Sequence, residues 1–393
     1  MAGREVVIVG AVRTPIGSFL GSLAGVQATQ LGAVVIREAL RRAGVEPSTV
    51  DEVIMGNVLQ AGEGQAPARQ AARHAGLPDT TPAWTLNKVC GSGLKAVISG
   101  AQAIALGDAE VVVAGGMESM SNVPYYDRAA RGGARMGNVE LVDGMIHDGL
   151  WDPYDRVHMG VCAEACAQSQ DISRAQQDEY AIESTRRAAE AARAGAFRAE
   201  IVGVEVPGKK GEATLVTEDD GPKQARPDKI PSLKPVFKKD GTVTAANASS
   251  INDGAAALVL MSAERARAEG RPVLGGLTAW AGAARKPVEF TIAPADAVRK
   301  LLAKVKLQTK DIDLWEINEA FAVVSIANNR LLGLDGKDVN VRGGAVVLGH
   351  PIGASGARIL VTLLHAMKDL DRKRGLATLC IGGGEAVAAI VER

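Results

Sequence analysis

The sequence predicts an α/β protein built from two similar halves, with mostly parallel sheets covered by helices on both faces. Strand-like apolar runs alternate with helix-like repeats, which is the pattern of parallel sheets. Two distant segments, residues 36–53 and 298–315, share one pattern, and 45 glycines among 393 residues indicate many tight turns. A chain of this length is too large for one simple core, so two or three domains are expected.

The repeated segments are IREALRRAGVEPSTVDEV (36–53) and VRKLLAKVKLQTKDIDLW (298–315). Each begins with a helix-like apolar period, crosses a short polar loop and reaches Asp51 or Asp313 ahead of an apolar strand. Asn57 and Asn318 then close these strands, and Cys90 and His350 follow at nearly equal spacings. VVVAGGMES (111–119) resembles TLCIGGGEA (378–386). Four shared segments in one order indicate a duplicated α/β unit.

The two halves are separated by a stretch of different texture. It holds Gly-rich loops, a long polar helix expected over Ser173–Ala194 and the basic run KQARPDKIPSLKPVFKK (223–239). The expected domains are residues 1–120, completed by 248–270, an inserted loop domain over 121–247, and a second half over 271–393. We expect the insertion to cover the functional site.

Composition excludes several classes of function. Lys plus Arg equals Asp plus Glu at 45 each, so no global field attracts nucleic acid or anionic membranes. Four cysteines are too few for a disulfide scaffold and favour reduced thiols. The chain enters a strand-like run at Val6 without a charged-then-apolar leader, and no apolar run approaches the roughly 20 residues of a membrane helix. A cytoplasmic enzyme is expected.

Cys90 lies in LNKVCGSGLKAV, where a helix pattern begins just after the glycines. A helix N-terminus stabilises negative charge, so this position is expected to lower the thiol pKa and favour the thiolate. His350 lies in GGAVVLGHPIGASG, interpreted as a turn between a strand and a helix. The alternatives are a buried structural cysteine and a loop histidine bonded to backbone.

Cys380 ends an apolar strand before three glycines, and Asn318 follows the strand DLWEI. The alternatives are a strand-core cysteine and a helix N-cap. Together with Cys90 and His350, both lie at carboxyl ends of expected strands, where open α/β sheets bind ligands. Two thiols, an imidazole and an amide suit carbon–carbon chemistry on a thioester: one thiolate takes the acyl group and a second base removes an α-proton.

His158, Cys162 and Cys166 recur at spacings of four, which would place them on one helical face. A metal site is conceivable, but a fourth ligand is missing nearby and the neighbouring residues are small and apolar. Packing is the favoured interpretation for both cysteines, and no metal site is expected.

Six segments, NKVCGSG, GGMESMS, NASSINDGAA, NEAFA, GHPIGASGAR and CIGGGEA, resemble the signatures of the thiolase family in their usual order. The resemblance covers essentially the whole chain. It implies a pair of βαβαβαββ halves plus a loop domain, and a homotetramer or homodimer.

The resemblance also implies roles. Cys90 matches the acylated nucleophile and His350 the base that activates it. Cys380 matches the residue that moves the α-proton and protonates the leaving thiolate, and Asn318 the side chain that holds a water beside the enolate oxygen. The N–H groups of Cys90 and Gly382 match an oxyanion hole.

Further positions resemble the family's substrate contacts. Ser249 resembles a residue that contacts the pantetheine arm, Phe321 resembles one at the pantetheine tunnel, and His158 and Met159 resemble residues beside the acyl pocket. The basic run supplies candidates for the phosphates of coenzyme A (CoA), namely Lys223, Arg226 and Lys229. CoA arrives on the substrate, so no separate cofactor is expected. Thr185 stands where a potassium-binding branch has tyrosine, which does not favour activation by potassium.

The activity implied is the reversible condensation of two acetyl-CoA molecules to acetoacetyl-CoA and CoA through an acetyl-cysteine. One alternative is a 3-ketoacyl-CoA thiolase of broader chain length, which shares every catalytic motif. A decarboxylating condensing enzyme is less favoured because it has no use for a proton-abstracting Cys380. A non-catalytic acyl-CoA-binding relative need not keep two thiols and His350 together.

Overall fold

The computed structural model describes residues 3–208 and 211–393, and within them the main sheet has ten strands. Along the sheet the order is β14-β15-β16-β13-β1-β12-β5-β3-β4, and the short β2 (Gly17–Ser18) pairs with β12. The first half contributes β1 (Val6–Arg13), β3 (Glu52–Gly56), β4 (Ala83–Leu86), β5 (Val111–Ser119) and β12 (Asn252–Ser262). The second contributes β13 (Gly275–Ala284), β14 (Leu314–Ile317), β15 (Arg374–Ile381) and β16 (Glu385–Glu392).

The duplication predicted from the sequence is confirmed by strand order. β1-β12-β5-β3 in the first half corresponds to β13-β16-β15-β14 in the second, with antiparallel, antiparallel and parallel pairing in the same sequence. The repeated aspartates, Asp51 and Asp313, make equivalent hydrogen bonds in the two halves. Asp51 accepts hydrogen bonds from the N–H groups that open β5, and Asp313 accepts them from those that open β15, at 2.7–2.9 Å. The α/β fold class is confirmed.

Strand pairing is more mixed than expected. Parallel pairing joins β3 to β4, β3 to β5 and β14 to β15, whereas the middle of the sheet is antiparallel. One reason is the turn over residues 382–384, where Gly383 and Gly384 adopt φ of +87° and +95°. A connection this short forces β16 to return beside β15 as a hairpin.

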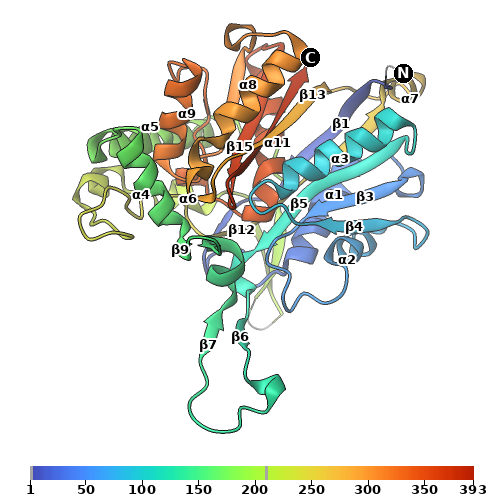
Figure 1. The fold of residues 1–393 in the computed structure, drawn as a ribbon. Helices are drawn as coiled ribbons and strands as arrows, with labels where there is room; N and C mark the ends of the chain where they lie inside the picture. Colours follow the sequence, from blue (N-terminus) through green and yellow to red (C-terminus); the bar gives the residue numbers. More distant parts are fainter. Residues whose placement is uncertain (1–2, 209–210) are drawn as a thin grey trace.

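Helices lie on both faces of the sheet and also between the halves (Figure 1). α3 (Ser92–Leu106) and α11 (Ile352–Asp369) pack against each other in a core shared with strands of both halves. α1 (Ala28–Ala43) and α2 (Pro67–His74) cover the first half-sheet, and α8 (Ala293–Val305) covers the second. α9 (Ala322–Leu332) lies beside α8.

Among the described residues, one stretch, Val89–Leu106, is long and apolar enough by composition to cross a membrane, with a mean hydropathy of 1.4. Of this stretch, 56% is buried inside the molecule. It comprises α3 and the three residues before it, and a helix that is apolar on all sides is typical of a protein core.

Over its described residues, 120–208 and 211–251, the stretch between β5 and β12 adds no strand to the main sheet. It forms three small antiparallel pairs, of which the hairpin β6 (Tyr125–Asp127) and β7 (Leu141–Asp143) projects from the body (Figure 1). The others are β8 (Trp151–Asp152) with β9 (Val157–His158), and β10 (Val204–Pro207) with β11 (Ala213–Val216). The helices are α4 (Met159–Ser169), α5 (Arg174–Arg193) and α6 (Asp220–Gln224). The predicted polar helix over Ser173–Ala194 is confirmed as α5, which Ser173 caps.

A buried ionic cluster fixes this stretch to the end of β1. Arg13 binds Asp219 through two hydrogen bonds of 2.7 and 2.9 Å and binds Glu200 at 2.6 Å, with all three side chains enclosed. Because the charges are paired and multiply hydrogen-bonded, their burial is tolerated. Asp219 precedes α6, which packs against α10 (Ala345–Leu348) just before His350. The insertion is thereby held against a loop of the candidate site.

Candidate active site

A cavity of about 390 Å³ contains six of the side chains singled out in the sequence. Most of its wall is apolar and is built by Met120, Leu150, Phe237, Phe290 and Ile352. The insertion supplies part of that wall through Leu150, His158, Met159 and Phe237. The six candidates that meet there are Cys90, His158, Met159, Ser249, Phe321 and His350.

Cys90 lies in the turn between β4 and α3. Val89, the residue before it, has a φ of +46°. A β-branched residue in the left-handed region is strained, and such strain clusters at functional sites. A Cβ at Gly91 would collide with the Ile381 side chain, so glycine permits β15 to approach the turn. Packing across the two halves therefore sets the position of the thiol.

The expectation that the helix N-terminus lowers the pKa of Cys90 is wrong for the free protein. Loss of hydration raises this pKa to about 11, and Glu118 adds to the effect. The N–H groups of Gly382 and of Cys90 itself face the sulfur and oppose the rise. Desolvation outweighs both, so the resting thiol is neutral and needs a base before it can attack a thioester.

His350 follows the short helix α10, and the prediction of a strand before it is wrong. Four apolar residues at 345–348 fit either state by pattern, and packing on α5 and α6 favours one helical turn. Gly349, at φ +107°, then reverses the chain. The His350 N–H donates to Asn252 Oδ1 at 2.8 Å, which fixes the backbone of the turn.

Hydrogen bonding assigns the tautomer of His350. Its Nδ1 lies 2.6 Å from Ser355 Oγ, whose hydroxyl donates to the Pro351 carbonyl at 2.9 Å. Nδ1 must therefore carry the proton, and Nε2 has a free lone pair. Nε2 is buried without a partner among the described residues. Burial, followed by the charge of Arg358, lowers the His350 pKa to about 3, so the imidazole is neutral and its Nε2 lone pair is available to accept a proton.

Cys380 is the second thiol of the site. It lies in β15, fully buried, as a strand-core cysteine would also be. Burial raises its pKa well above the ordinary value, and the nearby charge of a Cys90 thiolate raises it further. Because either thiolate disfavours the other, the pair is suited to carry one negative charge at a time.

Asn318 follows β14 and is 1% exposed. Neither polar atom of its side chain has a hydrogen-bond partner among the described residues, although buried polar groups are nearly always bonded. The alternative that it caps a helix is wrong, because α9 begins at Ala322. Residues 318–321, between β14 and α9, stay non-helical because the neighbouring Glu319 is held by other segments. Its carboxylate accepts hydrogen bonds from Tyr180, Ser184, Asn340 and the Val346 N–H. The Asn318 amide is left free for substrate or solvent.

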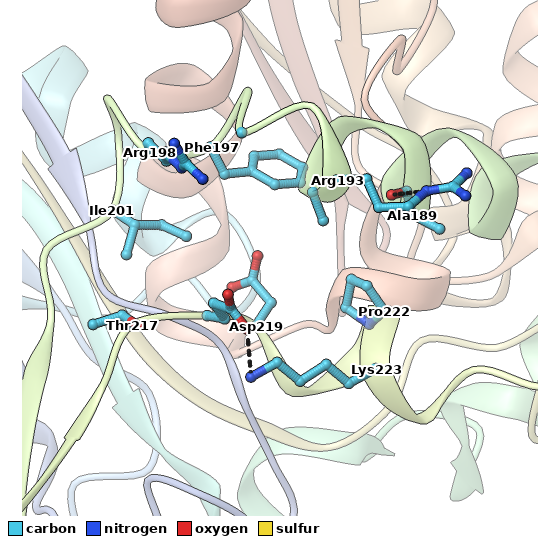
Figure 2. A pocket seen from close by; sticks show the side chains of 12 residues that line it. Ala189, Arg193, Phe197, Arg198, Ile201, Thr217, Asp219, Pro222 and Lys223 are labelled. Atoms are coloured by element: carbon cyan, nitrogen blue, oxygen red, sulfur yellow. Dashed lines mark hydrogen bonds and ion pairs between the residues drawn. The ribbon is translucent and has the colours of Figure 1, made fainter.

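The basic candidates do not line this cavity. Lys223, Arg226 and Lys229 are exposed, and Arg226 donates to the carbonyls of Gln224 and Ala225. Lys223 pairs with Glu218 at 2.7 Å and lines a separate hollow of about 520 Å³ (Figure 2). That hollow also contains Arg193, Phe197 and Arg198 but no thiol.

The possible metal group over residues 158–166 is a packing arrangement. His158 caps α4, accepts a hydrogen bond from the Gly160 N–H at 3.1 Å and stacks on Phe237 at 4.7 Å between ring centroids. Cys162 and Cys166 are buried in an apolar cluster with Met159 and Phe321. Residues 3–208 and 211–393 contain no group of three or more His, Cys, Asp or Glu side chains that could hold a metal.

Sequence patterns missed the residues that support the catalytic groups. Ser355 orients His350, Asn252 holds its backbone, and Met120, Leu150 and Phe237 shape the cavity. Ser355 lies in the segment after His350, so its place in the first turn of a helix was a possible signal. Asn252 and the apolar residues gave none, because only the tertiary structure brings them to the site.

Comparison with known proteins agrees with this geometry. Residues 6–264 match the family model for the thiolase N-terminal domain, and residues 271–393 match that for the thiolase C-terminal domain. The chain is 52% identical to an acetyl-CoA acetyltransferase of Schizosaccharomyces pombe over 100% of both chains. It is 54% identical to one of Pseudomonas aeruginosa, over 99% of this chain and 100% of that one.

Two solved structures are similar over nearly their whole length. The Bacillus anthracis acetyl-CoA acetyltransferase aligns with a TM-score of 0.97 at 43% identity, covering 100% of this chain and 99% of that chain. A thiolase from Ascaris suum in complex with coenzyme A aligns with a TM-score of 0.94 at 48% identity, covering 99% and 100%. The chain belongs to the thiolase family.

Proposed function

We propose that this protein is an acetyl-CoA acetyltransferase that condenses two acetyl-CoA molecules to acetoacetyl-CoA and CoA, and catalyses the reverse reaction. One observation carries the proposal: the Cys90 thiol and the free Nε2 of His350 share a cavity, with the Gly382 N–H facing the sulfur. Relatives of more than 50% identity over the full length carry the name of this activity.

In the first half-reaction, His350 Nε2 takes the Cys90 proton and the thiolate attacks the acetyl-CoA carbonyl. The N–H groups of Cys90 and Gly382 stabilise the resulting oxyanion, and one such donor is worth about 10²–10³-fold in rate. Collapse forms acetyl-Cys90 and expels the CoA thiolate, which Cys380 protonates. The low pKa of His350 and the high pKa of Cys90 make this proton transfer unfavourable in the free enzyme.

In the second half-reaction, the Cys380 thiolate removes an α-proton from a second acetyl-CoA. His350 and a water held by Asn318 stabilise the enolate oxygen. The enolate carbon attacks the carbonyl of acetyl-Cys90, and Cys90 leaves as a thiolate that regains its proton from His350, while Cys380 keeps the α-proton. Each proton and acyl transfer is thereby assigned to a side chain, so we propose that no cofactor is needed beyond the CoA of the substrate.

The cavity favours short acyl groups. Its volume of about 390 Å³ must hold the end of the pantetheine arm as well as the acyl group. Ser249 is held against the Ala320 carbonyl at 2.8 Å, where it can contact that arm. The rival function, a thiolase of broader chain length, predicts comparable rates on longer 3-ketoacyl-CoA substrates. Thiolysis of acetoacetyl-CoA and of 3-ketooctanoyl-CoA, measured side by side, tests the proposal, which requires a clear preference for the first.

The positive charges of residues 223–239 are proposed to hold the phosphates of CoA. Replacing Lys223, Arg226 and Lys229 together by alanine should raise the KM for CoA several-fold in thiolysis and leave kcat nearly unchanged. The physical reason is that exposed charge contacts affect binding and are screened over about 10 Å at 0.1 M salt. The difference from wild type should therefore shrink as salt increases.

A matched control removes three exposed lysines of the second half, Lys310, Lys368 and Lys373. This variant loses the same charge and should keep the KM of wild type. An unchanged KM in the first variant, or an equal rise in both, would show that the basic run does not bind CoA.

We also propose that the chain assembles as a dimer or tetramer. The projecting hairpin and the segment between its strands expose Tyr125, Met136 and Leu141 at 62%, 99% and 61%, and apolar side chains grouped in this way favour association. Sedimentation equilibrium should give a mass of two or four times 40.8 kDa. Replacing Met136 and Leu141 by aspartate should reduce that mass, whereas Leu106→Asp, at an isolated exposed leucine of α3, should not. A monomeric wild type would contradict the proposal.

A further inference from the structure

Glu118 is a fully buried carboxylate near the end of β5, with no lysine or arginine within 4 Å among the described residues. Four neutral donors surround it: the Asn57 side chain at 3.0 Å and the N–H groups of Val58, Leu59 and Gly353 at 3.2, 3.1 and 2.8 Å. Burying a carboxylate without a counter-ion is costly, so its presence points to a specific task.

The duplicated α/β unit does not by itself require a buried glutamate at this position. The equivalent residue of the second half is Glu385, whose side chain is 38% exposed and pairs with Lys88. Glu63, which also contacts Asn57, raises the pKa of Glu118, but loss of hydration is the larger cause and brings it to about 8. Glu118 therefore lies in an environment unlike that of its repeat partner.

The donors belong to segments that build the cavity or pack against its wall. Val58 and Leu59 follow β3, and Gly353 opens α11 three residues after His350. Leu59, Met120 and Ile352 form one apolar cluster, and Cys90 packs against it. A Cβ at Gly353 would lie 2.7 Å from Glu118 Oε2, so the helix start fits closely on the carboxylate. The Glu118 side chain thus joins β5, the loop after β3 and α11, and these segments lie close to Cys90 and His350.

We infer that Glu118 is a positioning residue for the condensation, acting through His350 and Cys90 without touching substrate. Its carboxylate holds the first turn of α11, the turn that carries Ser355 and so orients the His350 imidazole. When this carboxyl is ionised, its negative charge also disfavours a thiolate at Cys90. The inference rests on the proposed function.

Glu118→Gln and Glu118→Asp together separate these effects. The amide has the same shape, but each Glu118 oxygen accepts two N–H bonds, so the NH₂ group must face two donors and weakens the cluster that joins β5, the loop after β3 and α11. We expect kcat to fall about 10- to 100-fold, in the range that displacement of a catalytic group costs. The KM for acetyl-CoA should stay within about twofold, because Glu118 does not line the cavity.

A second measurement tests whether the charge of Glu118 affects the ionisation of Cys90. Alkylation of Cys90 by iodoacetamide, followed against pH, should show its midpoint shifted down in Glu118→Gln, because a buried negative charge is removed. The other ionisable groups of the site, His158, His350 and Cys380, and Glu63 beside Glu118, are unchanged in sequence. Glu118→Asp keeps the charge but shortens the reach, so its midpoint should stay near that of wild type while kcat falls.

Asp253→Asn is the matched control. Asp253 is equally buried on the adjacent β12 and binds Ser119 and Ser121, away from α11. This variant should lose stability but keep kcat and the alkylation midpoint. If Glu118→Gln keeps the kcat of wild type, or changes no more than Asp253→Asn, the inference is wrong. If it does not fold, Glu118→Asp decides, and an unchanged kcat there contradicts the inference.

The two proposals fail differently. A wild-type protein without condensation activity would contradict the proposed function, whereas the alkylation midpoints are measured without acetyl-CoA. A wild-type enzyme that condenses acetyl-CoA, with Glu118→Gln equal to it in kcat and in alkylation midpoint, would contradict only the role of Glu118.

Discussion

Cys90→Ser is expected to abolish condensation and thiolysis, with a loss on the order of 10⁴-fold or more, as loss of a nucleophile costs other covalent enzymes. Serine keeps the shape of the side chain, but its hydroxyl is far harder to ionise than a thiol. The His350 imidazole, whose pKa is lowered to about 3, is too weak a base to compensate. Intact-protein mass spectrometry after mixing with acetyl-CoA should show an added acetyl group on wild type, on the peptide that contains Cys90, and none on the variant.

Cys162→Ala is the control for this experiment, since Cys162 is fully buried and does not line the cavity. It should lose some stability, about 1 kcal/mol, as core truncations of this size do, and keep the acetylation of wild type. Circular dichroism should show that both variants are folded. Stable acetylation at another residue, or full turnover in Cys90→Ser, would contradict the assignment of Cys90 as the nucleophile.

Cys380→Ser is expected to separate acylation from carbon–carbon bond formation. Acetyl transfer to Cys90 needs only the nucleophile, His350 and the oxyanion donors, so acetyl-enzyme should still accumulate. Removal of the α-proton needs a base, and a serine hydroxyl is far weaker than a thiolate. Loss of a general base costs about 10²- to 10⁴-fold, so condensation should fall by that factor.

Deuterated water makes the distinction direct. Wild type mixed with acetyl-CoA should incorporate deuterium into the methyl group, and Cys380→Ser should form acetyl-enzyme without incorporation. Cys166→Ser, which alters a neighbouring buried thiol of the same cluster, should retain exchange. If Cys380→Ser loses acetylation together with exchange, Cys380 helps to activate Cys90, and the division of roles proposed for the two thiols is wrong.

The sequence predicted those features that depend on local pattern. The shared segments around Asp51 and Asp313 revealed the duplication because each aspartate ties the same pair of strands. Cys90 and His350 stood out because each precedes an equivalent helix, α3 or α11, within glycine-rich turns. Segments repeated in one order constrain topology strongly, so the fold class followed from them.

Features that depend on burial could not be predicted in this way. The direction of the Cys90 pKa shift was expected from the helix N-terminus, but desolvation by residues distant in the chain decides it. The four apolar residues before His350 form a helix because they pack on the insertion. The supports of His350 at Asn252 and Ser355 have meaning only once the chain is folded. The sequence therefore predicted where the catalytic residues lie relative to the strands. It did not predict their pKa values or the residues that hold them in place.

The duplicated architecture has a consequence for ancestry. Cys90 lies on the first half, whereas Asn318, His350 and Cys380 lie on the second. The helices that follow Cys90 and His350, α3 and α11, are repeat equivalents packed side by side. On the proposed assignment, a peptide holding one repeat would carry an incomplete reaction centre. An ancestor with a single repeat could have carried out this chemistry only by pairing two chains across that helix contact, and gene fusion would then have freed each copy to specialise, one in acyl transfer and the other in proton transfer.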